Sequence, residues 1–169
     1  MRLKTRLFIA LFPLLPIVIL STSAQEAPRS IAKKPTEIPP SAYREAKQSI
    51  GTLNRAQQAY YLENDRFTTN LEATGVGIKP DGADYRYRLF VAPDRYPAAL
   101  QVALPKTSDL PTFIGLVHAT KLDRQTATIA TLCISKKPGT PMPLWRMIDY
   151  KNSKKGEPIA CPSGFTPTK

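Results

Sequence analysis

Few side chains in this sequence of 169 residues could carry chemistry. It contains two cysteines, Cys133 and Cys161, and a single histidine, His118. Thiolate and imidazole groups bind zinc, but a structural zinc site requires four such ligands at closer spacing. We therefore expect no metal and no cofactor. We expect His118 to lie on the face of a strand, on the same side as Ile114 and Leu116.

The sequence also lacks a recognisable catalytic motif. Nucleophilic catalysis requires a nucleophile, a base and an orienting group, and no Gly-x-Ser-x-Gly elbow occurs in the chain. The segment Gly75-Val76-Gly77 is too short for a phosphate-binding loop and precedes an expected strand rather than a helix. These features predict a protein that is not an enzyme.

The basic residues are the other candidates, because the chain carries a formal net charge of +11. Basic side chains near aromatic ones suit single-stranded nucleic acid or another acidic polymer. The alternative is a solvated face, since long basic side chains also cover apolar surface. The candidate anion-binding surface consists of Arg86, Arg88, Lys136, Lys137, Lys151, Lys154 and Lys155.

The first 24 residues have the pattern of a secretory signal peptide. Basic residues come first, an apolar run follows from Leu7 to Leu20, and small residues precede a cleavage site after Ala24. The run is shorter than the roughly 20 residues that a membrane span requires. We expect an exported protein, periplasmic or extracellular, with no stable membrane insertion after cleavage. An uncleaved N-terminal membrane anchor is the alternative.

The remaining chain divides into a tether and a domain. Residues 25–40 are rich in proline and charge, which predicts a disordered tether and leaves residues 41–169 as one globular domain. In an exported chain, an even number of cysteines favours a disulfide. We therefore predict a Cys133–Cys161 bond, with two buried free thiols as the alternative.

A long helix is the clearest element. Large or apolar residues recur every three or four positions between residues 43 and 60, which predicts an amphipathic helix. Ser41 can cap its start, and Asn64-Asp65 marks its end. The predicted buried stripe is Tyr43, Ala46, Ile50, Leu53, Gln57 and Tyr60, and the predicted water-facing residues are Arg44, Lys47, Gln48, Arg55 and Gln58.

Four strands are predicted after the helix, at residues 85–91, 100–104, 113–119 and 126–135. Short connections between consecutive strands favour an antiparallel meander. One helix followed by such a sheet predicts an α+β fold in which the helix covers the apolar face of a four-stranded sheet.

Several segments resemble the type IV pilin-like G and H family, which is associated mostly with cyanobacteria. The helix segment NRAQQAYY, followed by a charged turn and Phe67, is similar to a recurrent run of that family. Residues 71–78 resemble its passage into the sheet, with Thr74 where the family has leucine. Thr131-Leu132-Cys133 and residues 160–164 resemble its paired C-terminal cysteines. The resemblance covers about residues 41–168.

The resemblance implies a pilin-like fold with a disulfide-closed C-terminal loop. It also implies an exported structural or protein-interaction module, associated with type IV pili or a pseudopilus-type secretion apparatus. Its partners would be pilins or secretion-apparatus proteins. The alternative function is a periplasmic or extracellular module that binds nucleic acid or acidic polysaccharide.

The N-terminus departs from this family. Pilins of this kind open with a long apolar helix that sits in the membrane and packs the filament core, whereas residues 1–24 resemble a cleaved signal peptide. We therefore expect a pilin-like globular domain that does not form filaments alone.

Overall fold

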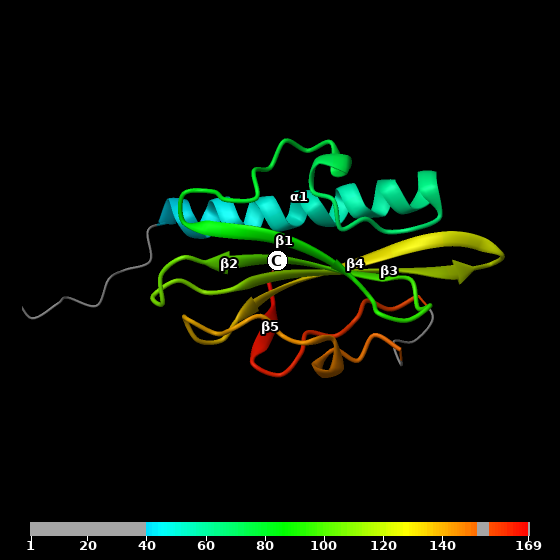
Figure 1. Ribbon diagram of the computed structural model, residues 1–169. Coiled ribbons are helices and arrows are strands. Elements are labelled where there is room, and N and C mark those ends of the chain that lie inside the picture. The colour runs from blue at the N-terminus through cyan, green and yellow to red at the C-terminus, as the bar shows by residue number, and fades with distance from the viewer. Residues whose placement is uncertain (1–39, 152–155, 169) are drawn as a thin grey trace, which may run out of the picture. The chain divides into compact units, whose positions relative to one another are not determined.

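The computed structural model describes residues 40–151 and 156–168 (Figure 1). The predicted signal peptide and all but the last residue of the predicted tether lie outside these residues. The described elements are one long helix, two short 3₁₀ helices and five strands.

Helix α1 spans Pro40–Asn64. Proline suits the first helical position, because its missing N–H would have no partner there. The helix therefore begins one residue before Ser41, which lies inside the first turn instead of capping it. At the other end, Asp65 has a φ of 53° and its N–H donates to the carbonyl of Tyr61 over 2.8 Å. This left-handed residue ends the helix where the sequence predicts.

The predicted stripe of α1 faces the sheet. Ala46, Ile50, Leu53 and Gln57 are each 0% exposed, whereas Tyr43 and Tyr60 are partly buried. The Gln57 amide forms two hydrogen bonds with the backbone of Thr68, at 2.6 and 3.1 Å, and so holds the chain that follows the helix. Gln58 was predicted to face water, but it contacts the sheet instead. Its Nε2 donates a hydrogen bond to the Thr128 carbonyl over 2.9 Å.

Replacing Ile50 or Leu53 with alanine is expected to lower the free energy of unfolding by about 3 kcal/mol, through lost burial and a cavity. Arg44→Ala and Gln48→Ala, on the exposed face, are the controls and should change it by less than about 0.5 kcal/mol. Urea denaturation measures all four variants. Equal effects in the two pairs would contradict the assigned helix face.

The sheet has five strands, not the four that the sequence predicts. They lie in the order β1-β2-β3-β4-β5, and each neighbouring pair is antiparallel. The predicted meander is therefore correct for the first four strands. The strands are β1 (Tyr85–Val91), β2 (Ala98–Pro105), β3 (Phe113–Leu122), β4 (Gln125–Ser135) and β5 (Phe165–Pro167).

Strand β5 pairs only with the end of β4, from Cys133 to Ser135. Its three residues are too few to show alternation, and they end in Pro167, which is a poor strand residue except at an edge. Gly164, with a φ of 86°, makes the turn that directs Phe165 back to β4. These features explain why the strand pattern does not reveal β5.

Both faces of the sheet are covered (Figure 1). Helix α1 packs on one face, over a core that includes Tyr85, Tyr87 and Phe113. The C-terminal loop, residues 136–164, packs on the other face through its described residues, 136–151 and 156–164, where Ile148 and Ile159 meet Leu100 and Leu116. Strands β2 and β3 accordingly have nearly continuous burial instead of alternation.

Candidate functional site

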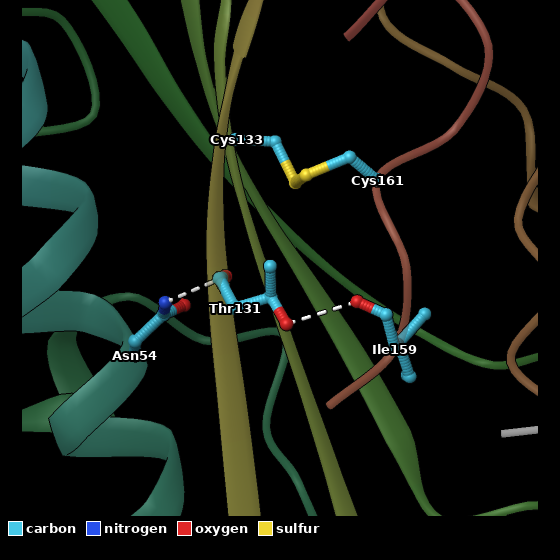
Figure 2. Close-up of a disulfide and its surroundings, with 5 residues drawn as sticks. All are labelled: Asn54, Thr131, Cys133, Ile159 and Cys161. Atoms are coloured by element: carbon cyan, nitrogen blue, oxygen red, sulfur yellow. Dashed lines mark hydrogen bonds between the residues drawn. A yellow bond between two sulfur atoms is a disulfide. The ribbon is translucent and has the colours of Figure 1, made fainter. Parts of the chain in front are cut away.

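The C-terminal loop is fixed to the sheet by a disulfide. Cys133 of β4 is bonded to Cys161, with their Cα atoms 5.9 Å apart and a sequence separation of 28 (Figure 2). The predicted disulfide is present. It attaches the end of the loop to the sheet, because β4 also pairs with β3 from Gln125 to Ile134.

Thr131 of β4, two residues before Cys133, is hydrogen-bonded both to helix α1 and to the C-terminal loop (Figure 2). Its carbonyl accepts from Asn54 Nδ2 of α1 over 3.0 Å, and its hydroxyl donates to the Ile159 carbonyl over 2.9 Å. Strand β4 is thus held by the helix on one side and by the loop on the other. These bonds could not be predicted from the sequence, since nothing in the spacing of Asn54 and Thr131 indicates their contact.

Aromatic packing holds the middle of the loop. The Tyr150 ring lies 5.0 Å from the Trp145 ring and 5.5 Å from the Tyr96 ring, between centroids. Its hydroxyl donates to Asp94 Oδ2 over 3.1 Å, and Lys151 Nζ lies 2.6 Å from the same oxygen. The hydrogen bond from Lys151 holds the pKa of the Asp94 carboxyl below its usual value.

The loop also presents apolar side chains to solvent. Leu144 is 45% exposed and Met147 is 48% exposed; Leu144 precedes the short 3₁₀ helix Trp145–Met147, and Met147 is its last residue. The next residue, Ile148, is 4% exposed and belongs to the core beneath the loop. A segment whose inner side is anchored while its outer side is apolar is suited to contact with another protein.

The structure places the predicted anion-binding residues in different parts of the fold. Arg86 and Arg88, on β1, lie 3.5 and 4.0 Å from carboxylate oxygens of Asp81. Lys136 and Lys137 follow β4, from which β1 is separated by β2 and β3. Lys151 pairs with Asp94, and Lys154 and Lys155 lie outside the described residues. Anion binding by this set stays a prediction.

His118 lies on the sheet face that the loop covers, as expected from its phase with Ile114 and Leu116. It is 1% exposed, and its Nδ1 has no hydrogen-bond partner among the described residues. Burial lowers the pKa of its imidazole below the ordinary value of 6.5. The two cysteine sulfurs are bonded to each other, and the described ranges contain no group of three potential metal ligands.

The burial of His118 predicts a loss of stability in mild acid. Below about pH 6.5 the unfolded chain binds a proton that the folded imidazole does not, so the free energy of unfolding should fall by up to about 1.4 kcal/mol per pH unit. Urea denaturation between about pH 7.5 and 5.5 measures this slope. A folded His118→Gln variant should have a smaller slope, and an equal slope would contradict this account.

Most of the chain matches a known protein family. Residues 44–162 match the type IV pilin-like G and H family. The chain belongs to this family. The match begins near the start of α1, includes the first four strands and reaches one residue beyond Cys161. The predicted family is thereby confirmed over most of the chain.

Type IV pilin-like proteins of this kind are generally exported and generally non-enzymatic. Neither the curated proteins nor the solved structures contain a match to this chain. Within residues 40–151 and 156–168, no helix combines the length and apolar character that crossing a membrane requires.

Proposed function

We propose that this pilin-like protein is an exported structural and interaction module of the cell envelope, which associates with a type IV pilus or a pseudopilus-type secretion apparatus. The observation that carries the proposal is the extent of the family match. It includes the helix, the first four strands and both bonded cysteines, so the shared unit is nearly the whole described fold.

The C-terminal loop is the contact surface that we propose for a pilin subunit. Leu144 and Met147 are exposed there, while the disulfide and the aromatic cluster fix the backbone beneath them. A rigid apolar surface loses little conformational entropy on binding. This favours a protein contact at the loop.

The alternative, binding of an acidic polymer, has less support. Arg86, Arg88 and Lys151 each lie near a carboxylate of their own chain. An acidic polymer would have to compete with Asp81 and Asp94 for these three cations. Such binding would also weaken steeply as salt is added, because it releases condensed counterions.

Affinity capture of the tagged protein from the envelope fraction of its host tests the proposal. We expect pilin or pseudopilin subunits to co-purify, and a Leu144→Ser/Met147→Ser variant to capture at least about tenfold less, as for central apolar contacts of an interface. Leu62→Ser is the matched control, because Leu62 is an exposed leucine on α1. Equal capture by all forms, or capture of no pilin, would contradict the proposal.

A second expectation concerns filaments. If the apolar run Leu7–Leu20 is removed with the signal peptide, the mature chain lacks the kind of helix that packs a pilin filament core. The purified mature protein should therefore not polymerise alone. Electron microscopy of a concentrated sample is the measurement, and helical fibres made only of this chain would overturn the expectation.

A further inference from the structure

One edge of strand β4 has no strand partner over most of its length. Strand β3 pairs with β4 from Gln125 to Ile134, but β5 pairs only with Cys133 to Ser135. From Thr126 to Thr131, the described part of the chain places no strand beside the outer edge. Charged residues and proline usually protect an exposed edge from pairing with another strand. The segment from Thr126 to Thr131 contains neither.

The hydrogen bonds next to this segment show which backbone groups point outward. Thr168 N donates to the Leu132 carbonyl and Lys136 N donates to the Gly164 carbonyl, so the even-numbered residues of β4 face away from β3. Thr128 and Ala130 therefore direct their N–H groups outward. The Thr128 carbonyl accepts from Gln58, whereas the Ala130 carbonyl has no strand partner in the described ranges.

A basic groove adjoins Leu132, the residue of β4 that follows this segment. It has a volume of about 630 Å³ and lies between α1 and Leu132. Its charged residues are Arg44, Lys47 and Arg55, and no carboxylate lines it. None of these three cations forms a salt bridge with a described residue. The groove therefore offers uncompensated positive charge that begins one residue beyond the open segment of β4.

Gly51 forms part of the groove floor although the fold does not require glycine there. A Cβ atom at this position would lie 3.8 Å from both Arg55 Nη1 and Leu132 Cδ1, which is ordinary van der Waals contact. Glycine inside a helix is destabilising relative to alanine. Its presence leaves the groove open at the point where α1 approaches β4.

We propose that this surface binds an extended acidic segment of a partner protein. The segment would add to β4 as a strand, bonding to the N–H groups of Thr128 and Ala130. Its carboxylates would lie against Arg44, Lys47 and Arg55. This is strand addition at a sheet edge, with charge giving selectivity. The proposal extends the interaction role proposed above and uses a surface separate from Leu144 and Met147.

Two other occupants fit less well. An acidic polysaccharide or nucleic acid could neutralise the cations, but it has no peptide backbone to pair with the edge. A second copy of the chain could pair its own β4 across a two-fold axis. That arrangement would place both helices on the same side of the continuous sheet, with the two sets of Arg44, Lys47 and Arg55 close together and uncompensated.

The test uses a synthetic peptide that alternates glutamate and valine over about nine residues, a strand of roughly 30 Å, with its ends acetylated and amidated. Fluorescence anisotropy measures its binding to the purified protein. We expect at least about a tenfold loss of affinity in an Arg44→Ala/Lys47→Ala/Arg55→Ala variant. Arg86→Ala/Arg88→Ala is the matched control and should bind as the wild type does.

A second experiment changes the peptide and uses the wild-type protein. Methylation of alternate peptide nitrogens removes the N–H donors on one edge of the peptide. Two peptides are made, one methylated on each edge, and these are called the two methylation phases. We expect one phase to bind at least about tenfold more weakly, because it cannot pair with β4. Equal binding of both phases and of the unmodified peptide would overturn the proposal.

Three further results would also overturn it. One is binding of a single-stranded oligonucleotide or an acidic polysaccharide as tight as that of the peptide and equally sensitive to the triple variant. Another is dimerisation with cross-links between two β4 strands. The third is no peptide binding by a protein that still captures pilins, which would reject this inference while leaving the proposed function intact. Loss of capture on the Leu144 and Met147 changes bears only on the proposed function.

Discussion

Cys161→Ser is expected to lower the free energy of unfolding by about 2–5 kcal/mol, the usual range for loss of a disulfide from a small secreted domain. The bond closes a loop with a sequence separation of 28, which by loop entropy alone contributes about 3 kcal/mol. Its loss also loosens the cover over one face of the sheet, where Ile148 and Ile159 are buried.

Urea denaturation with and without a reductant measures this effect. Reduction of the wild type should lower its stability by about as much as the substitution does, and the reductant should not change the variant. A Cys133→Ala/Cys161→Ala variant controls for the free thiol that Cys161→Ser leaves on β4. If reduction left the stability of the wild type unchanged, the loop would be held by packing alone.

Gly115→Ala is expected to lower the free energy of unfolding by about 3 kcal/mol or more, from overpacking and a lost buried hydrogen bond. A Cβ atom at Gly115 of β3 would lie 2.0 Å from Asn54 Oδ1 and 2.9 Å from Gln101 Oε1. Asn54 would have to move, and it would then lose its bond to the Thr131 carbonyl. Contact between α1 and the sheet thus depends on the absence of a side chain at Gly115.

The same substitution at Gly51 is the control, because a Cβ fits there. Gly51→Ala should stabilise the protein by about 0.5–1 kcal/mol through helix propensity. In a Gly115→Ala background, Asn54→Ala should recover part of the lost stability, because the two residues compete for one space. A neutral effect of Gly115→Ala would show that α1 does not approach β3 as closely as described.

The sequence was sufficient to predict the elements that have a strong periodic pattern. The spacing of Ile50, Leu53 and Gln57 identified the buried face of α1. The disulfide was predictable because an exported chain with two cysteines has only one internal pairing.

Periodicity does not predict that the C-terminal loop covers the sheet face opposite α1. The residues that cover it, such as Ile148 and Ile159, are spaced irregularly in a segment rich in proline and lysine, so no period reveals them. The close approach at Gly115 did leave a signal. An isolated glycine within a strand pattern indicates that another group lies near the backbone.

The ion pairs of the basic residues depend on turns whose positions in space the sequence pattern does not predict. Asp81 precedes β1 and pairs with Arg86 on that strand. Asp94 lies between β1 and β2 and pairs with Lys151, which is distant in the sequence. The groove beside β4 depends on the contact of α1 with Leu132. A surface of this kind is defined only by the packed structure.

Site-specific photo-cross-linking at Met147 in intact cells is the most direct test of the pilin-associated role. A photoreactive residue at this exposed position of the C-terminal loop should form a covalent product with a pilin or pseudopilin subunit, identified by mass spectrometry. The same residue at Leu62 on α1 should not form that product. If Met147 gives no product with such a subunit, or if both positions give the same product, the proposed role of this loop is contradicted.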